Sequence, residues 1–309
     1  MANSTLPTNP VPTNSPPMGG SALRPTAGSI SVFGQFSWTY LFIYTVLIIG
    51  VIVAILPFLW MTSASLMTYG ETALRRPIPA VPQWGNYTEA WNEANFSKYF
   101  INSLIITLVT LGGQLFTSIL AAYAFARIRF AGRETIFALL LSTMMIPAMV
   151  LMIPNFMMVR GDIVPWGSWL NTLPAITVPF MASVFFIFLL RQFFAQIPNE
   201  LWDASRIDGA GHLRFLMQIV LPISRAPIFT VIIFGFTGAW NDFLWPLLVT
   251  TKEVWRPLMV GLYSFETEAG PQTQLLMAGS MITIIPILII YFITQKQYTE
   301  GIATSGLKG

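Results

Sequence analysis

The segment from Ile197 to Pro222 gathers side chains that could do chemistry in a chain that otherwise carries little charge. Its titratable members are Glu200, Asp203, Arg206, Asp208, His212 and Arg214. A catalytic histidine needs a nucleophile and an orienting partner, and a metal-bound histidine needs further ligands. Neither set accompanies His212, the single histidine of the sequence. We therefore expect no catalytic residue and no metal site, and we interpret the segment as a binding surface.

The spacing within this segment predicts two short helices joined by a glycine turn. Asn199 is a residue type that caps helices, and Glu200 and Asp203 follow where the helix dipole favours negative charge. Gly209 stands where helices commonly end in a left-handed residue, and a second apolar stretch then runs to Pro222. We expect a helix–turn–helix with about nine residues per arm, so that the first arm is about 13 Å long and far too short to span a membrane.

The rest of the chain has the composition of an integral membrane protein. Hydrophobic residues make up 54% of its 309 residues and charged residues 9%, against roughly 25% charged residues in a soluble domain. The absence of cysteine excludes disulfides and thiolate metal sites. Six apolar runs are each long enough to cross about 30 Å of hydrocarbon as a helix, and none alternates as a barrel strand would. They are Thr39–Thr62, Ile101–Ala126, Thr135–Met158, Pro174–Ala195, Arg225–Val249 and Leu276–Thr294.

The expected fold class is an all-α integral membrane protein of six transmembrane helices, with the short helix–turn–helix between spans 4 and 5. Residues 1–35, rich in Pro, Ser, Thr and Asn, are expected to form a disordered tail before a membrane domain over 36–309. Several runs contain proline, which removes a helix hydrogen bond and favours kinks. These prolines are Pro57, Pro147, Pro154, Pro179, Pro227 and Pro286.

The basic residues predict which side of the membrane each loop faces. Six spans divide the 16 lysines and arginines between two sets of loops as ten and six. Because cytoplasmic loops carry the excess of Lys and Arg, the richer set is expected inside. Both termini and the 197–222 segment are then cytoplasmic, and the loops 63–100 and 250–277 lie outside.

Several strings in the chain match a known family. LWDASRIDGAGHLRFLMQIVLP resembles the cytoplasmic motif of bacterial ABC importer permeases, whose core is Glu-Ala-Ala, about three residues, then Asp-Gly-Ala. Asp203-Ala204-Ser205 occupy the first triplet, with a shorter acid and a hydroxyl as departures, and Asp208-Gly209-Ala210 match the second. The chain is also similar to the smaller permease subunit of the maltose-type carbohydrate branch over about residues 38–309. The strings that carry this resemblance are NYTEAW, FINSL, AYAFARIRFAGR, AWNDFLWPLLV and EGIATSGLKG.

The resemblance implies the permease subunit of an ATP-binding-cassette importer in a bacterial or archaeal cytoplasmic (inner) membrane. It would form the path for a sugar that an extracytoplasmic binding protein, soluble or lipid-anchored, delivers. The other partners would be a second permease subunit, of different sequence, and two ATPase subunits that hold ATP and Mg. The chain itself has no G-x-x-x-x-G-K-[ST] loop, so no cofactor is expected in it. The implied ATPase-coupling residues are Glu200, Trp202, Asp203, Ala204, Ser205, Asp208, Gly209 and Ala210.

Two further groups of residues allow two interpretations each. Trp240, Asn241 and Asp242 could form an interfacial belt, or could line the outer half of a sugar path, because amides, carboxylates and aromatic faces bind sugars. The methionines of the third run favour a flexible packing surface over a substrate pocket. They are Met144, Met145, Met149, Met152, Met157 and Met158. The outer segment 87–99 could form an amphipathic interfacial helix. By the resemblance, either this segment or the outer loop 255–274 could receive the binding protein, and the resemblance favours the loop.

The alternatives differ in what they require of the chain. The same machinery could import glycerol 3-phosphate or a polyol. A stand-alone secondary transporter or channel would need charges inside its spans as ion or proton relays, and the six runs hold nearly none. An intramembrane serine protease would need a nucleophile–base pair, and the sequence contains no G-x-S-x-G.

Overall fold

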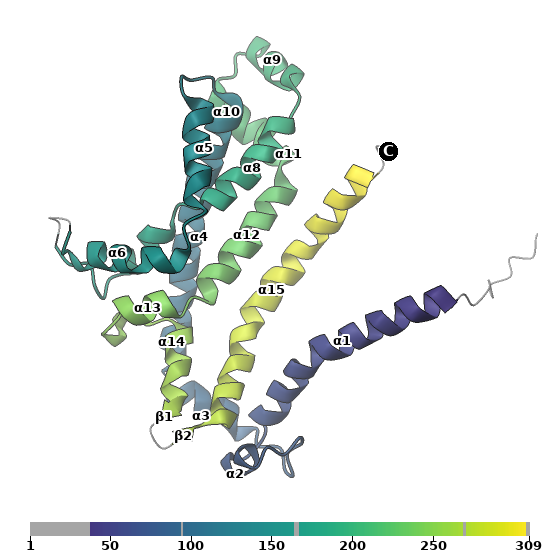
Figure 1. Ribbon diagram of the computed structural model, residues 1–309, viewed down its shortest axis with the longest axis vertical. Helices are drawn as coiled ribbons and strands as arrows, with labels where there is room; N and C mark the ends of the chain where they lie inside the picture. The colour runs from purple at the N-terminus through teal and green to yellow at the C-terminus, as the bar shows by residue number, and fades with distance from the viewer. Residues whose placement is uncertain (1–37, 94, 164–166, 268–269, 307–309) are drawn as a thin grey trace, which may run out of the picture. The chain divides into compact units, whose positions relative to one another are not determined.

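The computed structural model describes residues 38–93, 95–163, 167–267 and 270–306 (Figure 1). The tail predicted over residues 1–35 lies outside these residues. The chain divides into two units at Ala54. The described part of the first unit is the start of α1, and the contacts below all belong to the second unit.

Three of the six apolar runs form single long helices. They are α1 (Trp38–Ser65), α4 (Phe96–Arg127) and α15 (Thr273–Gly306). Their apolar stretches of 26, 32 and 23 residues are each long enough to cross a membrane. Pro57 and Pro286 lie inside α1 and α15 without ending them. The first, second and sixth predicted helices are therefore confirmed.

The third, fourth and fifth runs are broken helices instead of single ones. The third run divides into α5 (Arg133–Thr143) and α6 (Ala148–Arg160), which meet at 97° across a break that contains Pro147. Proline disfavours the helical conformation for the residue before it and lacks an N–H. At 11 residues α5 is about 16 Å long, roughly half of the hydrocarbon thickness. The expectation of a single helix over the third run is therefore wrong, because the run is divided at the break that contains Pro147.

The fourth and fifth runs are also divided into shorter helices. In the fourth, α7 (Leu173–Thr177) and a 3-10 turn (Val178–Phe180) precede α8 (Val184–Gln196) with a bend of 44°. The fifth run forms α12 (Arg225–Trp240) and then α13 (Leu244–Val249). A third bent pair joins His212–Ile223 to α12 at 82°, and six crossings among the described residues result only if each bent pair counts as one span.

The remaining elements are short. Outside the long helices lie α2 (Tyr69–Ala73), α3 (Gly85–Glu93), α9 (Asn199–Ile207), α10 (His212–Phe215), α11 (Leu221–Ile223) and α14 (Leu258–Leu262). A π-helical turn (Leu216–Val220) joins α10 to α11, and 3-10 turns cover Glu253–Trp255 and Tyr263–Phe265. A two-residue pair, β1 (Glu266–Thr267) and β2 (Gly270–Pro271), runs antiparallel with Thr267 opposite Gly270.

Helix α4 lies at the centre of the second unit, with α8 and α12 packed along it (Figure 1). Toward α9 and α10 the core buries large side chains of α8 and of the stretch after Gly211, among them Phe194, Phe215 and Val220. Toward β1 and β2 it buries Phe96 and Trp240 against α14 and α15. The helices that carry the loop of residues 197–222 thus share one apolar core with α4.

Two buried polar side chains at the start of α4 hold the loop before α14. Asn102 Nδ2 donates to the carbonyl oxygens of Val254 and Arg256, each at 2.9 Å. Ser103 Oγ accepts from the N–H of Leu258 at 2.7 Å. The FINSL string therefore has a structural use, because its asparagine and serine satisfy backbone groups of a loop about 150 residues later.

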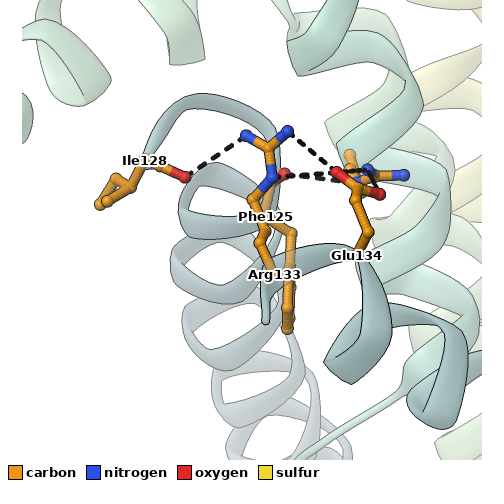
Figure 2. Close-up of polar contacts among 5 residues, drawn as sticks. Phe125, Ile128, Arg133 and Glu134 are labelled. Carbon is orange, nitrogen blue, oxygen red and sulfur yellow. Dashed lines mark hydrogen bonds and ion pairs between the residues drawn. The ribbon is translucent and has the colours of Figure 1, made fainter. Parts of the chain in front are cut away.

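An ion cluster joins α4, α5 and α8 near the end of α4. Figure 2 shows Glu134 beside Arg133, whose Nε lies 2.9 Å from Glu134 Oε1. From α8, Arg191 Nη2 approaches Glu134 Oε2 at 2.9 Å, and its Nε donates to the carbonyl oxygen of Phe125 at 3.3 Å. The Arg191 guanidinium also lies 3.9 Å from the centre of the Phe137 ring. Arg191 therefore holds three helices together through charge, hydrogen bonding and cation–π contact.

Candidate functional site

The loop between α8 and α12 begins with the nine-residue helix α9, which lies at one end of the second unit (Figure 1). The expected side-chain cap from Asn199 is absent, because Asn199 lies within the helix after Pro198. Its Oδ1 instead accepts a hydrogen bond from Arg127 Nη1 at 3.2 Å, and Arg127 Nη2 donates to the carbonyl oxygen of Pro198 at 3.3 Å. The last residue of α4 thus fixes the start of α9.

The end of α9 confirms the predicted glycine turn. Gly209 has φ +74°, in the left-handed region that disfavours L side chains. Its N–H donates to the carbonyl oxygen of Arg206 at 3.0 Å, and the N–H of Ala210 donates to that of Ser205 at 2.9 Å. This pair of bonds is the Schellman motif, which satisfies carbonyls that a helix end leaves open.

An aromatic cluster joins α9 to the second arm and to α4. The Trp202 ring stacks on the His212 ring at 4.4 Å and meets the Phe215 ring edge-on at 5.0 Å. The hydroxyl of Tyr123, a buried residue of α4, shares a hydrogen bond of 2.9 Å with His212 Nδ1. His212 therefore has a structural use: it connects the finger, which we define as residues 199–211, to the long central helix.

The predicted coupling residues fall on two sides of α9. Glu200, Asp203, Ala204, Asp208 and Gly209 are exposed, together with Ile207, whose side chain is 87% exposed. Ser205 is buried and its Oγ donates to the carbonyl oxygen of Trp202 at 2.7 Å. Trp202 and Ala210 are half-buried. Trp202 and Ser205 thus face the rest of the loop, so that they shape the finger, whereas the exposed residues offer the surface.

A second candidate site is a cavity of about 490 Å³ between α4, α6, α8, α12 and α13. Its polar lining side chains are Thr110, Gln114, Asn155, Ser183 and Asp242. Apolar and aromatic side chains, such as Phe180, Phe186 and Trp245, complete the wall. A concave site with an apolar wall and a few polar groups is typical of small-molecule binding.

The family follows from comparison with known proteins. Residues 114–299 match the family model described as the binding-protein-dependent transport system inner membrane component. The chain belongs to this family. The matched residues contain the finger, the second arm and much of the cavity wall, so both candidate sites lie in the part that defines these permeases.

Similar permeases differ in the solute that their names give. The sn-glycerol-3-phosphate transport system permease protein of Yersinia pestis is 30% identical over 276 residues, which cover 86% of this chain and 96% of the relative. The diacetylchitobiose uptake system permease protein of Streptomyces coelicolor is 30% identical over 266 residues, or 84% and 86% of the two chains. The arabinooligosaccharides transport system permease protein of Bacillus subtilis is 32% identical over 232 residues, or 75% and 81%.

A solved structure shares the fold of this permease. The crystal structure of a bacterial ABC transporter involved in the import of the acidic polysaccharide alginate matches with a TM-score of 0.74 at 23% identity. The match covers 85% of this chain and 98% of that chain. At this identity the likeness shows the fold alone.

The three residues predicted for the substrate path have separate places in this permease. Asp242 lines the cavity, whereas Trp240 and Asn241 are absent from its wall. Trp240 is 1% exposed, stacks on Phe236 and donates from Nε1 to the carbonyl oxygen of Thr283 at 3.0 Å. The ring of Trp240 therefore packs in the core and is not part of the cavity wall.

Sequence reasoning missed Gln114 and Asn155 of the cavity wall. Both had a signal, because LGGQLF and IPNFMM each place an amide inside an apolar run, and polar residues within spans are often functional. Met149 and Met152 also line the cavity, so part of the methionine cluster belongs to a pocket wall as well as to packing.

One prediction concerns the bond between α4 and His212, the residue that follows the finger. Replacing Tyr123 by phenylalanine removes the hydroxyl that bonds His212 and keeps the ring, so the free energy of unfolding should fall by about 1 kcal/mol. The measurement is the unfolding midpoint of the purified permease in detergent. Tyr69→Phe, at an exposed tyrosine of α2, is the matched control and should change the midpoint little. Equal midpoints for both variants would contradict the stabilising role.

Proposed function

We propose that this permease is a subunit of an ATP-binding-cassette importer and forms the path for a sugar that an extracytoplasmic binding protein delivers. The observation that carries the proposal is the finger, which presents an exposed, charged surface at the end of a rigid turn. A chain without a phosphate-binding loop needs a protein contact through which ATP-driven motion can enter. The finger supplies a surface of the required stiffness, because the Schellman turn fixes its own end. Its start is held by Arg127 of α4, and the adjoining His212 bonds Tyr123 of α4.

In this proposal the finger docks on an ATPase that binds ATP and Mg. Two such ATPases and a second permease subunit of different sequence complete the membrane complex. The docking residues are Glu200, Asp203, Ala204, Asp208 and Gly209, with Trp202, Ser205 and Ala210 holding them in place. The finger and both termini then lie in the cytoplasm, which agrees with the excess of lysine and arginine in that set of loops.

The loop from Trp255 to Gln274 is the proposed contact for the binding protein. Asn102 and Ser103 of α4 hold the backbone just before α14 by hydrogen bonds, so the start of this loop is fixed to α4. The loop contains Pro257, which also lines the cavity. A partner that presses on this loop would therefore act directly on the wall of the solute site.

Sugar is favoured as the solute by two of the relatives and by the cavity. The Streptomyces coelicolor and Bacillus subtilis permeases carry diacetylchitobiose and arabino-oligosaccharides in their names. The cavity offers amide, hydroxyl and carboxylate groups beside aromatic rings, the groups that bind sugars. The name of the Yersinia pestis relative keeps glycerol 3-phosphate as the second candidate solute. A polyol is a further alternative.

The test of the proposed function is reconstitution of the permease with its partner subunits and binding protein in proteoliposomes. We expect ATP hydrolysis to rise when the binding protein carries its solute, because loaded binding protein must shift the permease toward the state that the ATPases favour. Neutral oligosaccharides, polyols and glycerol 3-phosphate are tried in turn. If no loaded binding protein stimulates hydrolysis, the importer assignment fails.

A second prediction concerns the docking surface. Replacing exposed Asp203 by lysine should reduce recovery of the ATPase on co-purification by about tenfold. The positive charge of the lysine would repel the cationic partner groups that the Asp203 carboxylate attracts in this proposal. Glu89→Lys, at an exposed acid of α3, makes the same change away from the finger and should leave recovery unchanged. Unchanged recovery with Asp203→Lys would remove this residue from the docking surface.

A further inference from the structure

The polar groups of the cavity wall can accept hydrogen bonds from a solute, but they include no cationic side chain that could pair with an anion. Among the described residues that line it, none is lysine, arginine or histidine, and Asp242 is the one with an ionisable side chain. The other polar side chains are the hydroxyls of Thr110 and Ser183 and the amides of Gln114 and Asn155. Phosphate and carboxylate groups bind proteins through charge-assisted bonds from cations, and this wall provides none.

Gln114 adds an acceptor that the protein itself leaves open. Its Nε2 donates to the carbonyl oxygen of Phe180 at 2.9 Å, which fixes the amide. Its Oε1 is buried and has no hydrogen-bond partner among the described residues. Beside it lies Gly235, also part of the cavity wall, where an added Cβ would stand 2.7 Å from Oε1. The missing side chain of Gly235 therefore leaves room for this buried, unpaired acceptor to pack against α12.

Asp242 lies at the break between α12 and α13, where it can serve both the fold and the cavity. The backbone N–H of Trp245 donates to its carboxylate, which helps to order the first turn of α13. The residue is half-buried on the cavity wall, so its carboxylate lies where a solute would arrive. An anionic solute would meet an acid in a poorly solvated site with no compensating cation on this wall.

We propose that the cavity binds uncharged, hydroxyl-rich solutes and that Asp242 is a specificity-determining residue that excludes phosphorylated and carboxylated ones. The proposal rests on the proposed function, and it separates this permease from the Yersinia pestis relative, whose name gives a phosphorylated solute. Hydroxyl groups of a neutral solute donate to Asp242. A phosphate has no donor for this acceptor unless it is protonated.

The test measures solute binding to the purified complex in detergent without the binding protein, so that this chain's own preference is seen. The probes are diacetylchitobiose, arabinobiose, glycerol and sn-glycerol 3-phosphate, each followed by equilibrium dialysis at millimolar concentrations. We expect wild type to retain at least one neutral oligosaccharide and to bind sn-glycerol 3-phosphate at least about tenfold more weakly. Asp242→Asn keeps a side chain that accepts from the N–H of Trp245 but loses the charge. This variant should reduce the difference in affinity between the neutral probe and sn-glycerol 3-phosphate several-fold.

Two controls keep a change of fold apart from a change of selectivity. Gly235→Ala places a methyl group beside Gln114 Oε1 and should weaken retention of the neutral probe without improving that of the phosphate. Asn155→Asp adds a second acid to the wall and should widen the gap. Both variants are compared with wild type in their unfolding midpoints.

Several outcomes overturn the proposal. The proposal fails if wild type binds sn-glycerol 3-phosphate as tightly as the neutral probe, or more tightly. It also fails if Asp242→Asn leaves the ratio of the two affinities unchanged, or if no probe binds. If loaded binding protein still stimulates ATP hydrolysis while the cavity binds no probe, the importer function stands and only the solute site fails. If hydrolysis is never stimulated but the neutral probe binds, the cavity stands and the coupling fails.

Discussion

Solute uptake should be lost when Gly209 is replaced by valine, while the permease still inserts into the membrane. Gly209 holds φ +74° in the Schellman turn, and a β-branched residue in that conformation costs about 1–3 kcal/mol. The finger then either strains or unwinds its turn, and the exposed end of α9 changes direction. Because about 1.4 kcal/mol corresponds to a factor of ten, we expect ATP-dependent uptake in proteoliposomes to fall at least about tenfold.

The chain offers a matched control two residues away. Gly211 has φ −83° and ψ 177°, an extended conformation that valine adopts readily, and an added Cβ there meets no atom within 4 Å. Gly211→Val should therefore keep most of the uptake. At Gly209 an added Cβ also meets no atom within 4 Å, so the difference between the two variants isolates the backbone. Similar uptake in both variants would show that the turn is dispensable for coupling.

Loss of Arg191 should destabilise the permease more than loss of any exposed arginine. In Arg191→Met the chain loses the bonds to Glu134 and to the carbonyl oxygen of Phe125, as well as the contact over the Phe137 ring. The Arg191 side chain is 18% exposed, so water replaces these contacts only in part. We expect the free energy of unfolding to fall by about 2 kcal/mol.

The measurement is chemical unfolding in detergent, with hydrogen exchange over residues 125–134 as a local readout. Arg160→Met is the matched control, because Arg160 forms an ion pair of the same 2.9 Å length with Asp162 at a side-chain exposure of 57%. An exposed pair contributes about 0–1 kcal/mol, so this variant should stay near wild type. Equal losses in both variants would mean that the cluster does not hold α4, α5 and α8 together.

The long helices and the finger could be predicted from the sequence because local patterns determine them. Runs of apolar residues define α1, α4 and α15, and Gly209 occupies the one position of its turn that needs a positive φ. The breaks are harder to predict, since Pro57 and Pro286 stay inside helices while Pro147 lies between two. A proline removes a helix hydrogen bond in each case, so its presence alone does not mark a break.

The candidate sites depend on contacts between distant parts of the chain, and these escape pattern reasoning. Trp202 could be assigned to the coupling loop, but its inward direction depends on His212 and Phe215. Trp240 and Asp242 are two residues apart, yet the end of α12 between them sends one into the core and the other to the cavity. Gln114 has a visible signal, but its open acceptor becomes apparent only beside Gly235.

The length of α4 has a consequence for how events at separate places can be linked. One uninterrupted helix of 32 residues carries Asn102 against the loop before α14, Gln114 at the cavity and Tyr123 against His212, next to the finger. From Asn102 to Tyr123 the rise is about 32 Å. A small rotation of this rod about its own axis would shift all three contacts in the same instant. The loop before α14, the solute cavity and the contact next to the finger would then be coupled through one helix, with no relay of side chains between them.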